Sequence, residues 1–442
     1  MSNYLWMTAA DLGRGIGRGE IHPVELVEHF LDAAQAHLRA KDIYARMTPR
    51  RARSMALAAA DRAKHGQRLG LLDGVPISWK DLFDASGTAC EAGTQLLKGR
   101  VPQKDAQVLE QATQQGLVCL GKTHMTELAF SGLGLNPKTA TPPCVNNEAW
   151  VPGGSSSGAA ASVAFGLAAA GIGSDTGGSV RIPAAWNDLV GLKTTHGRLS
   201  LRGVVPLCEK FDTVGPLTRS VEDATLLLAV LDGTKPADLR GASLKGARLL
   251  VLETVALDDL RPEVAAGFDV VSQRLIRAGA TLHRGVMPIV SEALSLAPII
   301  FTSEAYGTWG ETIERAPEKM FAPVLARFRS GGIFTASDYV GAWRRLNELR
   351  ALWQAEVSNY DAVILPTSPI LPPDRARLLS DQEYFTQENL LSLRNTRIGN
   401  LFGVCAVTLP TGQPSCGLSL MGLPGQEERL LRLSAAAERA LG

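Results

Sequence analysis

The sequence predicts an α/β protein in which helices cover a large, mainly parallel or mixed β-sheet. Apolar runs typical of buried strands alternate with segments of helical periodicity along the whole chain, which is the pattern of layered α/β folds. The length of 442 residues suits one large α/β core or two to three domains. The sequence contains no internal repeat and no low-complexity tail.

Helices are predicted where apolar residues recur with a period near 3.6. In one clear example Val24, Val27, Phe30 and Leu31 share a face, and Pro23 occupies the first turn, where its missing N–H costs nothing. The predicted helices span residues 8–16, 23–38, 51–64, 105–115, 158–167, 262–278, 337–357, 390–401 and 427–441, and a turn followed by a helix is predicted for 214–231.

Strands are predicted where short apolar runs are bounded by turn residues. The predicted strands span residues 117–120, 168–173, 189–193, 248–255, 281–286, 361–366, 405–409 and 417–421. Lys80 follows Val75, Ile77 and Trp79. It is either an exposed lysine beside a strand or a partly buried, functional lysine.

The composition is that of an ordinary soluble protein. The chain has 45 basic and 44 acidic residues with no block of like charge, so no partnership with nucleic acid or a membrane surface is indicated. No run approaches the roughly 18 apolar residues of a membrane span, and the N-terminal MSNYLWMTAADL lacks the features of a signal peptide. We therefore expect a cytoplasmic protein.

Cysteine and histidine patterns argue against a metal site. No two cysteines have CxxC spacing, so buried thiols in a reducing compartment are expected instead of structural zinc. The seven histidines form no HExxH motif. We predict no metal and no cofactor. The cysteines are Cys90, Cys119, Cys144, Cys208, Cys405 and Cys416.

Two glycine–serine clusters, residues 153–158 and 173–179, dominate the stretch 151–183. Glycines let backbone N–H groups converge on one point, where they can bind an oxygen that becomes anionic during a reaction. Nearby serines are candidate nucleophiles. A flexible linker is the alternative, but the small apolar residues between the clusters require burial. The clusters are therefore predicted to be loops fixed at the ends of core elements.

Two familiar motifs are judged coincidental. Residues 116–123 match the phosphate-loop pattern GxxxxGK[ST], but the four intervening residues are apolar and β-prone, which a phosphate-binding loop cannot be. Residues 154–158 match GxSxG, which would make Ser156 an elbow serine with His196 or His283 as its base. That elbow needs a hydrophobic strand before the first glycine, and NNEAWVPG cannot supply one.

Taken together, GVPISWKD around Lys80, GGSSSG, GSDTGGSVRIPA and GLKTTHGRLS resemble the amidase signature family of serine hydrolases. Similar segments, such as FDTVGPLTRSVEDATLLL and RNTRIGNLFG, extend the resemblance over nearly the whole chain. The resemblance implies one large α/β/α domain around a mixed sheet, over residues 1–442. Its signature core would span about 70–235, with a more variable segment at about 236–360.

The resemblance also implies a catalytic serine–serine–lysine triad. By motif position Ser179 is the nucleophile, Ser155 is the bridging serine that follows a cis peptide bond, and Lys80 is the base. The oxyanion hole maps onto the backbone N–H groups of four residues. Ser131 falls where family members place a loop residue close to the substrate, and we predict substrate contacts from Ser131 and Ser156. The four oxyanion-hole residues are Thr176, Gly177, Gly178 and Ser179.

Physical chemistry supports these roles. A serine hydroxyl is a weak nucleophile until a base removes its proton. With no candidate histidine, the base must be a lysine held neutral, and apolar neighbours lower a lysine pKa by disfavouring the charged form. Ser155 would relay the proton between Lys80 and Ser179.

We therefore predict an amidase that hydrolyses a small carboxamide and has neither nucleic acid nor a membrane as a partner. The sequence leaves the oligomeric state open, and the resemblance favours a homodimer. A second hypothesis is the amidase subunit of an aminoacyl-tRNA amidotransferase. That subunit usually carries a Met-Gly-Ser-Ser-rich segment where this chain has AFSGLGLNP. A binding protein on an inactivated scaffold is a third, disfavoured because all three triad residues are present.

Overall fold

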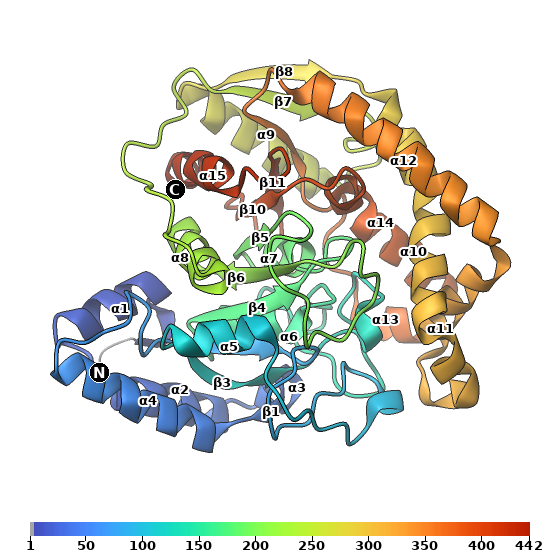
Figure 1. Ribbon diagram of the computed structural model, residues 1–442. Coiled ribbons are helices and arrows are strands. Elements are labelled where there is room, and N and C mark those ends of the chain that lie inside the picture. Colours follow the sequence, from blue (N-terminus) through green and yellow to red (C-terminus); the bar gives the residue numbers. More distant parts are fainter. Residues whose placement is uncertain (1–3) are drawn as a thin grey trace.

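A mixed sheet of eleven strands runs through the molecule from β1 at one edge to β8 at the other (Figure 1). The computed structural model describes residues 4–442. The strand order is β1-β3-β2-β4-β6-β5-β10-β11-β9-β7-β8. Strand β2 pairs in parallel with β3 and β4, and β7 with β8 and β9, whereas the other pairs are antiparallel. The predicted α/β class with a mixed sheet is confirmed.

The strands at the centre of the sheet are buried along their whole length, as their continuous apolar runs predict. Their bounds are β1 Tyr44–Met47, β2 Pro76–Lys80, β3 Val118–Thr123, β4 Ala170–Ser174, β5 Val190–Lys193, β6 Val214–Thr218, β7 Arg248–Leu252, β8 Thr281–Gly285, β9 Ala362–Pro366, β10 Ala406–Pro410 and β11 Gly417–Met421.

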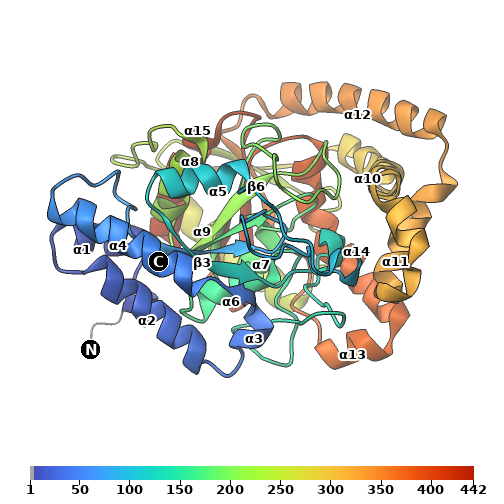
Figure 2. The same ribbon diagram turned by 60° about the horizontal axis from the view of Figure 1, so that its bottom comes forward.

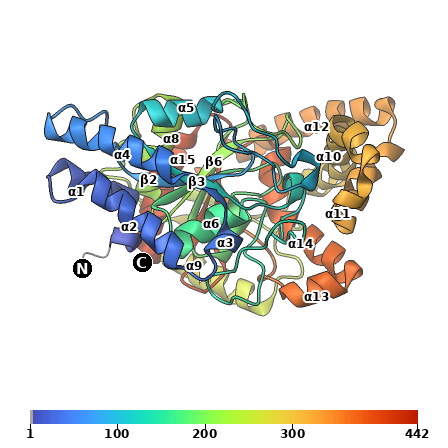
Figure 3. The same cartoon turned by 90° about the horizontal axis from the view of Figure 1, so that it is seen from below.

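Helices lie on both faces of the sheet, with α5 and α8 on one side and α3 and α6 on the other (Figure 3). Their bounds are α1 Ala9–Gly17, α2 Pro23–Ala36, α3 Ala40–Ile43, α4 Pro49–Lys64, α5 Gln107–Gln114, α6 Ser157–Ala164, α7 Arg181–Trp186, α8 Val221–Asp232, α9 Pro262–Arg277, α10 Pro288–Arg315, α11 Ala322–Arg329, α12 Ala336–Val357, α13 Arg375–Ser380, α14 Gln382–Leu401 and α15 Glu427–Leu441. Short 3-10 turns occur at Tyr4–Trp6, Gln95–Leu97, Glu127–Ala129, Pro317–Lys319 and Ser330–Ile333.

The predicted elements exist, and their ends shift by a few residues except at α14, which begins eight residues before the predicted start at 390. The sequence reasoning missed several other elements. Strand β6 was predicted as a turn because it contains Gly215 and Pro216. Pairing with β4 and β5 overrides that local signal. Glycine is needed at 215 because a Cβ there would lie 1.9 Å from the carbonyl oxygen of Leu192. Helix α10 was missed because Pro298 lies inside it. Strands β1 and β2 and helices α3, α7, α11 and α13 were also not assigned.

Helices α10, α11 and α12 form a flank along one side of the molecule (right in Figures 1 and 2). Helix α10 packs against α11, α12 and α14, so this flank is joined to the sheet-covering helices. The flank falls within the segment about 236–360. That this segment varies more than the core at about 70–235, and that both belong to one domain over residues 1–442, stay predictions.

The structure agrees with the rejection of both coincidental motifs. Gly121, Lys122 and Thr123 belong to strand β3, so the apparent phosphate loop is an extended strand. The residues directly before Gly154 form no strand, so the elbow of an α/β-hydrolase is absent from this part of the described chain.

Three simple properties of the described residues complete the fold. All six cysteines are buried and unpaired, as expected. In residues 4–442 no helix has the length and apolarity needed to cross a bilayer, and no group of three His, Cys, Asp or Glu side chains is placed to hold a metal ion. Residues 1–3, which belong to the segment used for the signal-peptide prediction, lie outside the described part.

Candidate active site

The candidate site is built at the carboxyl ends of the neighbouring parallel strands β2 and β4. Trp79 on β2 pairs with Ile172 on β4. The last residues of the two strands, Lys80 and Ser174, therefore lie side by side at the carboxyl edge of the sheet. The first glycine–serine cluster approaches this edge at Gly173, where a Cβ would lie 2.5 Å from the Ser156 hydroxyl. Glycine at 173 therefore allows the two clusters to meet.

Lys80 is fully buried and bonds to two serines. Its Nζ lies 2.7 Å from Ser155 Oγ and 2.8 Å from Ser174 Oγ. Burial lowers the pKa of Lys80 to about 7, although the carboxylates of Asp212 and Asp175 act in the opposite direction. Near pH 7 a large share of Lys80 is therefore a neutral amine, which can accept a proton.

Lys80 differs from the other two buried lysines in its partners. Lys122 forms an ion pair with Asp81 at 3.1 Å, and Lys193 donates to two backbone carbonyls. Carboxylate and carbonyl oxygens can only accept from these lysines, and burial lowers the pKa of Lys193 to about 8. Among the described residues, the side-chain partners of Lys80 are hydroxyl groups, which can both accept and donate protons.

Ser155 is held by its backbone in the loop before helix α6. The Gly154–Ser155 peptide bond is cis, as the resemblance implies. The N–H of Gly154 donates to Gly132 O at 2.8 Å, and the carbonyl of Ser155 accepts from Thr126 N at 3.1 Å. Both neighbouring segments thus fix the Ser155 hydroxyl against Lys80.

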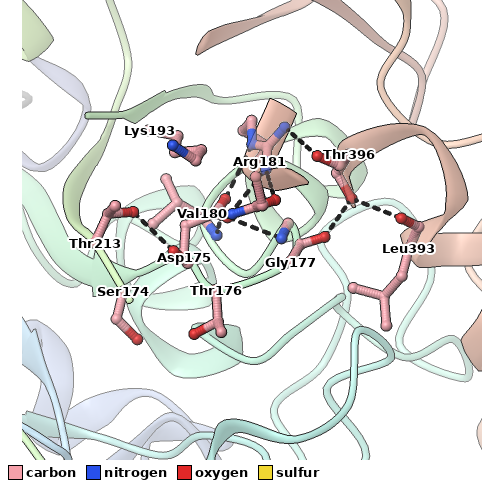
Figure 4. Close-up of polar contacts among 12 residues, drawn as sticks. Ser174, Asp175, Thr176, Gly177, Val180, Arg181, Lys193, Thr213, Leu393 and Thr396 are labelled. Atoms are coloured by element: carbon pink, nitrogen blue, oxygen red, sulfur yellow. Dashed lines mark hydrogen bonds and ion pairs between the residues drawn. The ribbon is translucent and has the colours of Figure 1, made fainter. Parts of the chain in front are cut away.

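The loop that carries Ser179 is organised by the buried carboxylate of Asp175 (Figure 4). Asp175 accepts hydrogen bonds from the N–H groups of Gly178 and Val180, and it forms a buried ion pair with Arg181 at 3.0 Å. Asn400 on α14 adds a further hydrogen bond. Burial alone would raise the pKa of Asp175, but Arg181 and these donors hold it well below its usual range. Asp175 therefore stays ionised, and its hydrogen bonds hold the loop in one conformation.

Three of the four predicted oxyanion donors remain available. The N–H of Gly178 donates to Asp175 at 2.8 Å. Within residues 4–442 the N–H groups of Thr176, Gly177 and Ser179 have no hydrogen-bond acceptor. We therefore carry Thr176, Gly177 and Ser179 into the proposed site as donors and assign Gly178 to loop geometry. Its φ of 138° favours glycine, and a Cβ there would lie 2.1 Å from Thr396 Oγ1.

Helix α14 and Asp212 support the same loop from two sides. Thr396 on α14 donates from Oγ1 to Gly177 O at 2.7 Å (Figure 4). The Thr176 hydroxyl donates to the buried carboxylate of Asp212. Burial raises the pKa of Asp212 to about 6, although hydrogen bonds from Thr176 and two backbone N–H groups act against the rise.

Ser179 lines a narrow space of about 20 Å³. A cavity of about 390 Å³ adjoins it, and the two share Phe301, Arg327 and Arg397 as lining residues. The carbonyl of Ser179 accepts from Ser156 N at 3.1 Å, which places it beside the Ser155 loop. Ser131 lines the same narrow space, and its hydroxyl donates to Asn389 Oδ1 at 2.9 Å. In the described chain, no histidine lines either space.

Ser156 lies outside the lining of the narrow space at Ser179. It is fully buried, its hydroxyl donates to Ser174 O at 3.2 Å and accepts from Ser174 N, and it does not line the cavity. We therefore do not carry the predicted substrate contact of Ser156 into the proposed site. Its hydrogen bonds join the two glycine–serine clusters.

The sequence reasoning missed Ser174, Asp175 and Asp212 as partners of the site. Ser174 and Asp175 belong to the recognised cluster GSDTGGS, and Arg181 six residues later signals a carboxylate–guanidinium pair. Asp212 lies in the segment FDTVGP, where nothing in the local pattern indicates a contact with Thr176.

Comparison with known proteins identifies the family. The sequence model of the amidase family matches residues 25–431. The chain belongs to the amidase family. The resemblance inferred from its motifs is thereby confirmed, and as a family member the protein is a hydrolase that acts on amide C–N bonds.

Two curated relatives of this amidase cover almost its full length. The chain is 34% identical over 456 residues to 2-amino-5-chloromuconic acid deaminase of Comamonas testosteroni, covering 100% of this chain and 97% of the relative. It is 32% identical over 473 residues to a glutamyl-tRNA(Gln) amidotransferase subunit of Anaeromyxobacter dehalogenans (strain 2CP-C), covering 98% of this chain and 96% of the relative.

Solved structures show the same amidase fold. A crystal structure of an amidase superposes with a TM-score of 0.88 at 28% identity, covering 99% of this chain and all of the other. Fatty acid amide hydrolase superposes with a TM-score of 0.88 over 99% of this chain and 86% of the other. Its identity of 20% supports a shared fold alone.

Proposed function

We propose that this amidase hydrolyses a small-molecule carboxamide through an acyl-enzyme on Ser179, with Ser155 and Lys80 completing the triad. The observation that carries the proposal is the buried 2.7 Å contact between Lys80 Nζ and Ser155 Oγ. Beside it, Ser179 lines a narrow space together with Thr176 and Gly177, and the N–H groups of these three residues have no acceptor among residues 4–442. A base, a relay and a nucleophile are thus available in one site.

In the first half-reaction Ser155 passes a proton from Ser179 to neutral Lys80 while Ser179 Oγ attacks the amide carbon. The tetrahedral oxyanion lies among the N–H groups of Thr176, Gly177 and Ser179, and loss of one such donor costs about 3 kcal/mol. Ser155 then gives a proton to the leaving nitrogen, and the C–N bond breaks. Water attacks the acyl-enzyme, which releases the carboxylate and free Ser179.

A second candidate function is supported by the amidotransferase relative. That relative is a subunit of a glutamyl-tRNA(Gln) amidotransferase. The relative from Comamonas testosteroni is instead named as a deaminase of a small acid, 2-amino-5-chloromuconic acid. The segment AFSGLGLNP, in place of a Met-Gly-Ser-Ser-rich segment, favours independent hydrolysis of a small amide. The buried, unpaired thiols support action in the reducing cytoplasm, and a homodimer stays an open prediction.

Purified protein should hydrolyse simple amides without any partner protein or tRNA. The test is ammonia release from a panel of small amides and from glutamine, by the chain alone and with the remaining subunits of an amidotransferase. Turnover of panel amides by the chain alone is expected. A chain that is inert on every amide, and active on glutamine only after the other subunits are added, would show the amidotransferase function instead.

Activity should rise with pH through about 7 and then level off. Lys80 must lose its proton to act as a base, and burial sets its pKa at about 7. The neutral, active form therefore predominates above that pH. The measurement is kcat/KM against pH, which reports on groups of the free enzyme. A rise that persists unchanged in Lys80→Met would mean that another group is the base.

The variant Asp212→Asn serves as a control for this profile, because the pKa of Asp212 is about 6 and lies close to the same range. The negative charge of Asp212 raises the pKa of Lys80. Removing that charge should move the rise in activity to lower pH. Disappearance of the rise in Asp212→Asn would assign it to Asp212 itself.

A further inference from the structure

Two arginines line the narrow space at Ser179. Arg327 comes from α11 and Arg397 from α14, and both line the narrow space at Ser179 and the adjoining cavity of about 390 Å³. The Cγ atom of Arg397 lies 3.7 Å from the place that a Cβ would take on Gly177. The two cations are therefore next to the proposed oxyanion hole, on segments far apart in the sequence.

Neither arginine has a carboxylate partner among residues 4–442. Arg327 donates one hydrogen bond, to Phe130 O at 2.9 Å, and its guanidinium lies 4.2 Å from the Phe130 ring centroid. Arg397 has no hydrogen bond and no ion pair within the described chain. Neither space is lined by an aspartate or a glutamate. Arg181, which is fully buried, is different because it is paired with Asp175.

The surroundings of both arginines disfavour positive charge. Burial lowers the pKa of Arg327 to about 9, and the positive charge of Arg397 contributes to the same shift. Burial lowers the pKa of Arg397 to about 10. Both side chains are half-buried, and two like charges kept close in such a place are costly unless an anion neutralises them. Each guanidinium can bind a carboxylate through two parallel hydrogen bonds.

The rest of the lining limits what carries this anion. Phe130, Leu207, Phe301 and Leu393 supply apolar surface around Ser179. This surface suits a carbon chain between the amide and the anionic group. Because the same arginines line the space at Ser179, that carbon chain must be short.

We propose that the preferred substrate is the monoamide of a short dicarboxylic acid, whose free carboxylate binds Arg327 and Arg397 while its amide carbon lies at Ser179. The proposal rests on the proposed function. Water cleaves the C–N bond, so the products are the dicarboxylate and ammonium. A substrate ammonium group would find no carboxylate in either space, so glutamine should be poorer than the monoamide of glutaric acid, which lacks only the α-amino group.

The first test compares kcat/KM for the monoamides of succinic, glutaric and adipic acids with kcat/KM for the uncharged diamides. We expect at least one monoamide to exceed its diamide by about 100-fold or more, the range for a desolvated charge pair. In Arg327→Met and Arg397→Met this ratio should fall toward one. Matched variants Arg329→Met on α11 and Arg394→Met on α14 should keep it. Diamides hydrolysed as well as monoamides would overturn the inference while leaving the proposed function intact.

The second test measures binding, so it does not depend on turnover. Calorimetry on Ser179→Ala should detect binding of glutarate and of its monoamide, and the added change Arg397→Met should weaken both by about 100-fold. Thermal unfolding of each variant shows whether it is folded. Equal binding with and without Arg397, in folded protein, would overturn the arginine site even if no amide proves to be a substrate.

Discussion

Replacing Ser179 with alanine should abolish amide hydrolysis and leave the fold unchanged. The substitution removes the attacking oxygen, and the Ser179 hydroxyl makes no hydrogen bond within the described residues whose loss would destabilise the protein. Loss of a nucleophilic serine lowers kcat by about 10⁴-fold or more. The measurement is ammonia release under saturating substrate, together with the thermal unfolding midpoint.

The matched control is Ser156→Ala. Ser156 lies beside the same loop and its hydroxyl bonds to the Ser174 backbone, away from the cavity. Its loss should change stability more than chemistry, with kcat reduced far less than in Ser179→Ala. Folded Ser179→Ala with near wild-type turnover would end the assignment of the nucleophile.

Replacing Lys80 with methionine should lower kcat/KM by about 10³-fold or more, the upper range for loss of a general base. Methionine fills the space of the buried lysine stem without its amine. Because burying an amine is costly, the unfolding midpoint should stay the same or rise. A loss of activity with retained stability separates a chemical role from a structural one.

The double variant Lys80→Met/Ser179→Ala tests whether the two residues act as one unit. Its activity should equal that of Ser179→Ala alone, because the base has no function once the nucleophile is gone. Activity losses that multiply in the double variant would show that Lys80 acts independently of Ser179.

Much of this site is predictable from sequence because its parts lie in three short motifs. The apolar neighbours of Lys80 indicated burial, and the structure places Lys80 fully buried at the end of β2. The glycine–serine clusters indicated converging loops, and Gly173 does bring them together. Here the local pattern was sufficient.

The cavity wall could not be predicted in the same way. Arg327 and Arg397 lie 70 residues apart in the numbering, and each occurs among ordinary helical residues. Only the packing of α10, α11 and α14 brings them to Ser179. Likewise β6 required its neighbours β4 and β5, because Gly215 and Pro216 alone indicate a turn.

Covalent labelling tests the central claim most directly. The wild-type protein is treated with a fluorophosphonate, and the modified peptide is mapped by mass spectrometry while residual activity is followed. We predict one adduct, on Ser179, formed in proportion to the loss of activity and much more slowly in Lys80→Met. An adduct on Ser155, Ser156 or Ser174 instead, or full activity in completely labelled protein, would contradict the assignment of Ser179 as the nucleophile.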